Sequence, residues 1–342
     1  MRIALLAPAW FAVPPVRYGG IEWVVSILAD GLVDRGHDVT LYAAGDSQTK
    51  AHLVTSYDEP PSYRIGMSLP DLHHTLTCLE EAEKYDVVHD HSGPVACALG
   101  QCIATPFCHT VHGPLTGEPG LVYAQIAKVS PPVRLISLSE NQRSPRPELN
   151  WLATCHNAID LDAYPIHPGN DGYLLFLGRM SPDKGAGNAV RVALETGMPL
   201  KLAGKIHDPI EHEYFDSAVR PHLGNSIEYV GEVSHNEKVE LLQRAAVTVF
   251  PIQWPEPFGL VMVESMACGT PVLATRLGAV PEVVEHGRGG LVVDTIDEMA
   301  ACIPRILALD PLEVRAVADE SFSAARMVLD YERAYELLVA DA

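Results

Sequence analysis

The sequence lacks the patterns that define several large classes of protein. It has no run of ~20 apolar residues, the length that a helix needs to span a bilayer, and no C-x-x-C pair among its seven cysteines. Positive charge is scarce, with 24 Lys and Arg against 44 Asp and Glu and a formal net charge of −20. This charge argues against nucleic acid and anionic lipid as partners. An odd, dispersed set of cysteines is typical of reduced thiols, and we expect a cytoplasmic protein.

Several catalytic fingerprints are absent as well. The chain has no G-x-G-x-x-G dinucleotide motif, no Walker phosphate loop, no G-x-S-x-G nucleophile elbow and no helical H-E-x-x-H zinc motif. A serine hydrolase or a zinc protease therefore has no support in the sequence. The opening residues, MRIALLAPAWF, are interrupted at Pro8, which predicts a first strand and not a signal peptide.

The chain does contain a long alternation of short apolar strands and helical stretches. The predicted strands of the first half are Ile3–Pro8, Val39–Ala43, Val87–His89, Phe107–Val111, Leu135–Leu138 and Leu152–Cys155. Those of the second half are Leu174–Leu177, Leu200–Ala203, Ile227–Val230, Val247–Phe250, Val272–Ala274 and Leu291–Val293. Near-continuous apolar strands are typical of parallel sheets covered on both faces. The 342 residues therefore predict an α/β protein with two doubly wound parallel sheets.

The two domains are predicted to meet near Asp160–Gly172, where prolines and glycines interrupt regular structure. This boundary gives a first domain of residues 1–160 and a second of residues 161–322. The last segment, Ser323–Val339, predicts one amphipathic helix.

Polar residues follow several of these strands at the point where each strand ends. They are Tyr18-Gly19-Gly20, Asp90-His91, His112-Gly113, Ser137 and Ser139, Asn157, Gly178-Arg179 and Gly204-Lys205. Ligands of doubly wound sheets bind at the carboxyl ends of the strands. The expected site is therefore a cleft between the two domains.

The most informative segment is Pro255–Pro271, which reads PEPFGLVMVESMACGTP. Glu264 lies in an apolar helical run, and a buried carboxylate needs hydrogen-bond donors such as sugar or ribose hydroxyls. The helix that follows Gly259 would offer N–H groups to a phosphate. The segment therefore predicts a nucleotide-sugar enzyme. Glu256 and Glu264 could instead be the paired carboxylates of a glycoside hydrolase, or a helix-terminal carboxylate and a surface glutamate.

Two further loops could hold phosphate. Leu177–Gly185 carries Arg179 and Lys184 five residues apart, and these two cations could clamp a diphosphate. Two solvated surface cations are the alternative. Tyr18–Glu22 opens the first long helix with two glycines that would let the backbone approach a phosphate, and a tight turn is the alternative there.

Fifteen histidines raise the question of a metal site. His89 and His91 alternate on one strand and so face the same side, and Asp160 and Asp162 form a D-x-D pair. No Cys/His cluster or helical histidine pair accompanies them, so we expect no metal. His112 is expected either to hydrogen-bond a substrate or to be satisfied within the core.

Together these elements resemble glycosyltransferase family 4, a family of retaining enzymes with the GT-B fold. The resemblance covers nearly the whole chain and is most specific in Gly178–Gly185 and Glu256–Pro271. It implies two Rossmann-like domains, with the acceptor on the side of the first and the nucleotide-sugar donor held mainly by the second. It also implies that the last helix, residues 323–342, packs back on the first domain. Two departures are Pro257 and Ala279, where the family often has glycine, and the first is expected to alter sugar selectivity.

The resemblance implies a role for each candidate residue. It assigns the diphosphate to Arg179 and Lys184, the ribose to Glu264, and the donor sugar to Glu256 and to the backbone of Phe258, Gly259 and Leu260. On the first domain it assigns the distal phosphate to Gly19 and Gly20 and the donor sugar to His112. Asn157 is predicted either to contact a substrate or only to form a turn.

The resulting expectation is a retaining glycosyltransferase that needs neither a metal nor a cofactor. It would move a sugar from a nucleoside diphosphate sugar, with UDP preferred to GDP, to a hydroxyl of a small, natural-product or glycan acceptor. The protein would position the reactants and stabilise the departing diphosphate. Two alternatives stay open: a related nucleotide-sugar epimerase or phosphorylase, and a nucleotide-binding module without catalysis.

Overall fold

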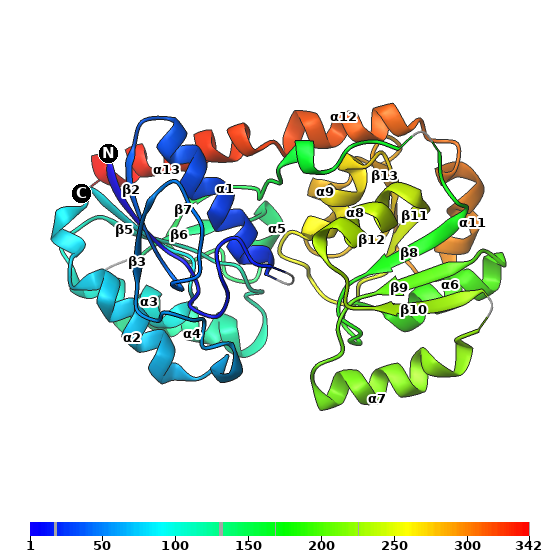
Figure 1. Cartoon of the computed structure of the whole chain (residues 1–342), viewed down its shortest axis with the longest axis horizontal. Coiled ribbons are helices and arrows are strands. Elements are labelled where there is room, and N and C mark those ends of the chain that lie inside the picture. The colour runs from blue at the N-terminus through cyan, green and yellow to red at the C-terminus, as the bar shows by residue number, and fades with distance from the viewer. Residues whose placement is uncertain (17–18, 130–132, 168, 225, 342) are drawn as a thin grey trace. The chain divides into compact units, whose positions relative to one another are not determined.

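Two compact units make up the chain in a computed structural model that describes residues 1–16, 19–129, 133–167, 169–224 and 226–341. The first unit comprises Met1–Ile159 and the C-terminal segment from Ala324, and the second comprises Asp160–Ser323. Each unit contains one parallel sheet with helices packed against it (Figure 1). The two parallel sheets predicted from the sequence are therefore confirmed.

The sheet of the first unit has seven parallel strands in the order β3-β2-β1-β4-β5-β6-β7. These are β1 Arg2–Leu6, β2 Asp38–Ala43, β3 His52–Thr55, β4 Val87–Asp90, β5 Phe107–Thr110, β6 Arg134–Ser137 and β7 Trp151–Thr154. The helices are α1 Gly20–Asp34, α2 Ser68–Leu79, α3 Pro94–Leu99, α4 Gly117–Val129, α5 Glu140–Arg143 and α13 Ala324–Ala340. The strand order reverses between β1 and β4, which is where such sheets bind ligands.

Alternation along β4 and β5 sends side chains of the first unit to two helical layers. Val88 and Phe107 pack in one cluster with Cys78 of α2. The next residue of β4, His89, points to the opposite face, where its Nδ1 lies 2.7 Å from the hydroxyl of Tyr335 in α13. The polar residues at the ends of these strands are therefore divided between two faces of the sheet.

The sheet of the second unit has six parallel strands in the order β10-β9-β8-β11-β12-β13. These are β8 Tyr173–Leu177, β9 Leu200–Ala203, β10 Ile227–Gly231, β11 Ala245–Phe250, β12 Val272–Thr275 and β13 Gly290–Val293. The helices are α6 Ala186–Thr196, α7 Pro209–Ala218, α8 His235–Arg244, α9 Leu260–Ala267, α10 Val280–Val283, α11 Asp297–Ile306 and α12 Pro311–Ser321. Here the order reverses between β8 and β11. Among the helices that the structure describes, none combines the length and hydropathy of a membrane span.

Candidate active site

The loops after β8 and β11 lie together at the point where the strand order of the second sheet reverses. The backbone N–H of Gln253 donates to the carbonyl of Asp183 at 2.7 Å. This contact accompanies an ion pair in which Lys184 Nζ donates to Glu256 Oε2 at 2.5 Å. A cation and a carboxylate that the sequence predicted separately, 72 residues apart, therefore form one pair.

Trp254 completes this cluster, and the sequence prediction missed it. Its indole Nε1 donates to the same Glu256 oxygen at 3.0 Å, and Lys184 Nζ lies 4.6 Å from the centroid of its ring. Glu256 is only 9% exposed, so these donors replace the water that the carboxylate has lost. The one available signal was the position of Trp254 two residues before Glu256.

Arg179 follows β8 and is held by acidic partners. Its Nη1 donates to Glu211 Oε1 at 2.8 Å, and its Nη2 lies 3.5 Å from Asp183 Oδ2. Burial favours a raised pKa for Glu211, but hydrogen bonds from the His207 N–H and from Arg179 outweigh it, and the net pKa is lowered. Both predicted cations thus lie on the loop after β8, each paired with a carboxylate.

Glu264 of α9 has a different set of partners. Its Oε1 accepts from the hydroxyl of Tyr164 at 2.8 Å and from the ammonium of Lys238. Burial, together with the neighbouring carboxylate, raises the pKa of Tyr164, so the hydroxyl keeps the proton that it donates. Glu264 is 7% exposed, and the donors that meet it in this structure are protein groups.

Helix α9 begins directly after Gly259, whose φ of 87° lies in the left-handed region. Glycine adopts this conformation without the strain that a side chain would cause. Within the described residues no side chain caps the helix, so its first N–H groups suit an anion. Phe258 is buried with its ring 5.7 Å from that of Phe322, while Leu260 is the first residue of the helix.

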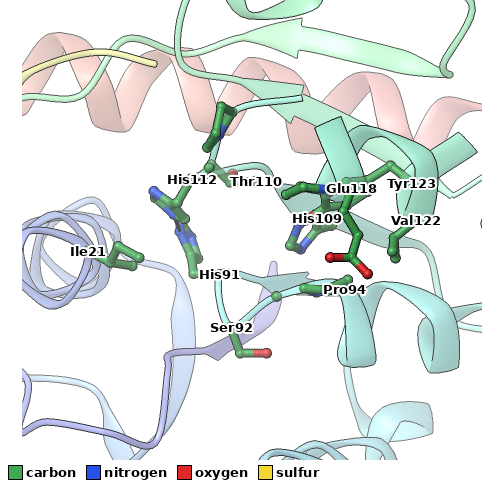
Figure 2. A pocket seen from close by; sticks show the side chains of 14 residues that line it. Ile21, His91, Ser92, Pro94, His109, Thr110, His112, Glu118, Val122 and Tyr123 are labelled. Atoms are coloured by element: carbon green, nitrogen blue, oxygen red, sulfur yellow. Dashed lines mark hydrogen bonds between the residues drawn. The ribbon is translucent and has the colours of Figure 1, made fainter. Parts of the chain in front are cut away.

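The first unit has a pocket of about 530 Å³ at the carboxyl ends of β4 and β5. Figure 2 shows Ile21 of α1 on one side of it and Val122 of α4 on the other. The polar side chains that line it are His91, Ser92, His109, Thr110, His112, Glu118 and Tyr123. The volume is in the range of pockets that bind small molecules.

His112 lines this pocket next to His91. The distance between His91 Nδ1 and His112 Nε2 is 2.9 Å, so one ring donates to the other. Burial, with a contribution from His109, lowers the pKa of His112 to about 3. Burial and the neighbouring histidines likewise lower the pKa of His91, so both rings are neutral near pH 7. His91 Nε2 is buried and has no hydrogen-bond partner in the described part of the chain.

His89 is a satisfied core residue. Its ring centroid lies 4.1 Å from that of His91, on the same side of the strand as the alternation predicts. Its Nδ1 meets Tyr335, and its Nε2 lies 2.8 Å from Thr110 Oγ1. Both ring nitrogens are therefore occupied by protein hydroxyls.

The remaining predicted contacts of the first unit lie at a helix start and after β7. Gly19 precedes α1 with a φ of 150°, and Gly20 is the first residue of the helix. Tyr18, predicted in the same loop, lies outside the described residues. Asn157 is buried; its carbonyl accepts from Arg326 Nη2 at 2.9 Å, and its Oδ1 has no partner among the described residues.

Asp160 and Asp162 form a local turn. The Asp160 side chain accepts the backbone N–H of Asp162 at 3.2 Å. Over the ranges that the structure covers, no three His, Cys, Asp or Glu side chains are grouped to hold a metal ion.

Two family models match consecutive parts of the chain. The one described as Glycosyltransferase Family 4 matches residues 18–162, and the one described as Glycosyl transferases group 1 matches residues 162–319. The chain belongs to glycosyltransferase family 4. It is a glycosyltransferase of the GT-B fold that transfers a sugar from a nucleotide sugar.

Similar proteins support this assignment over nearly the full length of the chain. Glycogen synthase from Mycobacterium tuberculosis is 26% identical over 380 residues, which cover 95% of this chain and 88% of the relative. The crystal structure of AviGT4, a glycosyltransferase involved in avilamycin A biosynthesis, is 29% identical with a TM-score of 0.77 and covers 100% of this chain and 99% of its own. Anabaena HepE, solved with UDP-glucose, shares the fold at 20% identity, with a TM-score of 0.72 and coverage of 99% and 100%.

Proposed function

We propose that this glycosyltransferase takes its sugar from a UDP-sugar and transfers it, with retention, to a hydroxyl of a small-molecule acceptor without a metal or cofactor. The observation that carries the proposal is the cluster of Lys184 and Glu256 at the β8/β11 reversal, with α9 starting a few residues later. A cation and a helix N-terminus suit a diphosphate, and a carboxylate suits sugar hydroxyls. HepE was solved with UDP-glucose, which supports UDP as the nucleotide of the donor; GDP is the second choice. AviGT4 supports a natural-product or glycan acceptor.

In this proposal, donor binding breaks the ion pairs that Lys184 and Arg179 form with carboxylates of the protein. Lys184 and Arg179 turn from carboxylates to the diphosphate, which carries more charge and offers more acceptor oxygens. Glu256 is then released to accept hydrogen bonds from the donor sugar. Glu264 accepts the ribose hydroxyls in the same way, from a position already lined with donors.

The other residues contribute position more than charge. The proposed contacts are the backbone of Phe258, Gly259 and Leu260 for sugar and phosphate, Gly19 and Gly20 for the distal phosphate, His112 for the donor sugar and Asn157 for a substrate. A neutral His112 can donate or accept one hydrogen bond, which suits a hydroxyl. The leaving diphosphate takes the acceptor proton as the bond from the sugar to phosphate breaks and the new glycosidic bond forms on the same face. The protein then contributes orientation and charge stabilisation.

Calorimetric titration with UDP and GDP tests the nucleotide contacts. Lys184→Ala should weaken UDP binding by about 1.5–3 kcal/mol, because a charge-assisted hydrogen bond is lost. Lys201→Ala is the matched control: Lys201 lies in β9 of the same unit, with its ammonium 4.4 Å from the Tyr173 ring centroid. We expect the control to bind UDP as the wild type does, and equal UDP affinity in Lys184→Ala would refute the assignment.

Single-turnover kinetics test the sugar contacts. Glu256→Ala and His112→Ala should each keep UDP affinity near wild type and lower the rate of transfer, because contacts that strengthen in the transition state appear in the rate. Incubation with donor alone, followed by analysis of its sugar, identifies an epimerase. A wild-type transfer rate in either variant removes that residue from the reacting centre.

A further inference from the structure

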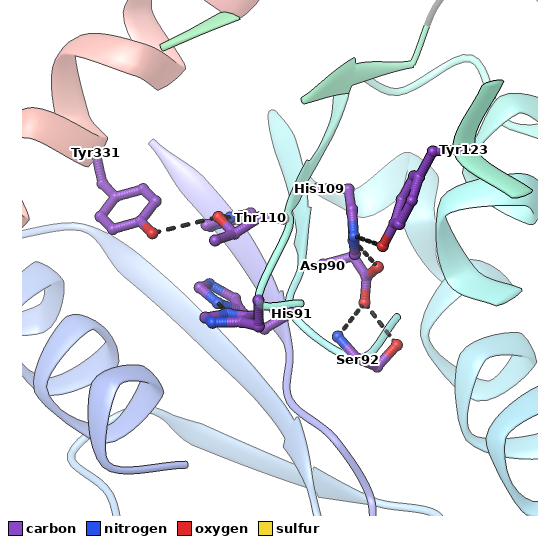
Figure 3. Close-up of polar contacts among 9 residues, drawn as sticks. Asp90, His91, Ser92, His109, Thr110, Tyr123 and Tyr331 are labelled. Carbon is purple, nitrogen blue, oxygen red and sulfur yellow. Dashed lines mark hydrogen bonds and ion pairs between the residues drawn. The ribbon is translucent and has the colours of Figure 1, made fainter. Parts of the chain in front are cut away.

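The pocket of the first unit is lined by hydroxyls whose protons are held by an internal network (Figure 3). Asp90 is its centre and is fully buried. Asp90 Oδ1 accepts from the backbone N–H of Ser92 at 2.7 Å and from the Ser92 hydroxyl at 2.6 Å. The Ser92 hydroxyl has only one proton, so its oxygen can offer a further ligand only lone pairs.

The other Asp90 oxygen orients a histidine in the same manner. Asp90 Oδ2 lies 2.5 Å from His109 Nδ1, and a carboxylate there selects the tautomer with the proton on Nδ1. In this neutral tautomer His109 Nε2 carries a lone pair and can accept from the hydroxyl of Tyr123, 2.7 Å away. Burial raises the pKa of Tyr123 well above its usual value, so the hydroxyl keeps its proton and has one to donate to His109. With its proton on this bond, Tyr123, like Ser92, offers a ligand only lone pairs.

The charged side chain in the pocket lining also disfavours anionic ligands. Glu118, in the first turn of α4, adds a carboxylate to the lining, and none of the described residues that line the pocket is Lys or Arg. A phosphate or carboxylate group on a ligand carries acceptor oxygens and negative charge, so at Ser92, Tyr123 and Glu118 it would meet acceptors and a like charge. A hydroxyl or an ammonium group supplies the donors that these oxygens need. A hydroxyl also satisfies the buried His91 Nε2 in either tautomer, because it can donate or accept.

We propose that this pocket binds the acceptor through a hydroxyl-rich ring that carries no phosphate or carboxylate, that is, a neutral sugar, a polyol or an amino sugar. Tyr123 and Ser92 accept hydrogen bonds from the ring, and Glu118 excludes its anionic counterparts. The inference rests on the proposed function for the identity of the ring as acceptor, but the selection is a property of the pocket alone. Sugar binding to the pocket can therefore be measured without a nucleotide.

Saturation-transfer NMR on the full chain without nucleotide provides the first test. The probes are four related sugars at equal millimolar concentration. Methyl glucoside is neutral, methyl glucosaminide carries an amino group, and glucose 1-phosphate and glucuronate are anions. The neutral or the amino sugar should bind at least about tenfold more tightly than both anions. Comparison of methyl glucoside with methyl glucosaminide shows whether the pocket prefers a hydroxyl or an ammonium group as the donor. Equal or tighter binding of the anions, or no binding of any probe, would overturn the proposal.

Two pairs of variants assign the selection to the named side chains. Tyr123→Phe should weaken sugar binding about fivefold or more, whereas Tyr335→Phe, which removes a hydroxyl bonded to a histidine at the same 2.7 Å outside the pocket lining, should not. Glu118→Lys should shift preference toward glucose 1-phosphate. Glu83→Lys makes the same charge change on an exposed residue before β4, at the opposite end of the strand, and should leave the preference unchanged.

UDP titrations of the same samples separate this inference from the proposed function. If sugars bind with the expected preference but UDP does not bind, the donor assignment fails and the pocket assignment stands. If UDP binds and both members of each variant pair behave alike, the pocket assignment fails and the donor site stands. UDP affinity and unfolding midpoints near wild type in Tyr123→Phe show that the variant is folded.

Discussion

At the scale of single residues, Glu22 makes the stability of the fold depend on pH. It lies in the first turn of α1 and is 4% exposed, and burial raises its pKa from 4.5 to about 7. The folded chain therefore holds this proton more tightly than the unfolded chain does. The stability that the proton provides is complete below the unfolded pKa of 4.5 and is lost as the pH rises through about 7.

Glu22→Gln should remove this titration. Between about pH 5 and about pH 8 the wild type should lose up to about 3 kcal/mol of unfolding free energy relative to the variant, because each pKa unit corresponds to about 1.4 kcal/mol. Urea unfolding of both proteins at the two pH values measures the difference. The same pH dependence in wild type and variant would contradict the role of Glu22.

The residues of the candidate site were predictable one by one, whereas their partners were not. Lys184 and Glu256 each lie among prolines and glycines that mark loops after strands, so a sequence pattern can find them. Their pairing joins positions 72 apart and depends on how β8 and β11 are placed in the sheet. Tyr123 meets His109 from a different element, and no short-range spacing records such a contact.

At the scale of secondary-structure elements, the ends of β8 and β9 approach too closely for a side chain. A Cβ on Gly204, whose φ is 147°, would lie 1.8 Å from the carbonyl oxygen of Gly178. Gly178 directly precedes Arg179. The contact between the two strand ends therefore fixes the loop that carries the proposed diphosphate cations.

Gly204→Ala should destabilise the protein more than Gly197→Ala does. Gly197 also has a positive φ, 70°, but a Cβ there would have no atom within 4 Å. The control therefore adds only backbone strain of about 1–2 kcal/mol, while Gly204→Ala adds overpacking of about 1–3 kcal/mol to it. Thermal unfolding compares the two variants, and UDP titration should show weaker binding for Gly204→Ala alone. Equal unfolding midpoints would show that the strand ends can separate without loss.

Burial explains which strands the sequence could predict. β8 reads YLLFL and is buried along its whole length, so a continuous apolar run marks it. β3, His52–Thr55, was not predicted. It lies at the edge of its sheet with none of its residues fully buried, so it has no such run. The sequence therefore predicted the interiors of both sheets and missed an edge.

At the scale of the whole molecule, a net charge of −20 opposes the approach of a diphosphate, so local positive charge must hold it. Arg179, Lys184 and the start of α9 can supply this charge. We expect transfer from the nucleotide sugar to continue in EDTA at the rate measured after simple dialysis. A complete loss of activity that Mg²⁺ or Mn²⁺ restores would contradict this expectation and would make Asp160 and Asp162 ligand candidates.

The first unit is built from two separate parts of the chain, and α13 is the second of them. α13 belongs to that unit although the whole second unit precedes it in the chain. Its Tyr331 and Tyr335 place hydroxyls next to Thr110 and His89. Both of these polar residues are fully buried, so they need hydrogen-bond partners within the protein. A ribosome adds these two tyrosines only after it has made residues 160–323. The first unit therefore cannot complete its core until α13 has been made, and α13 follows the whole second unit in the chain.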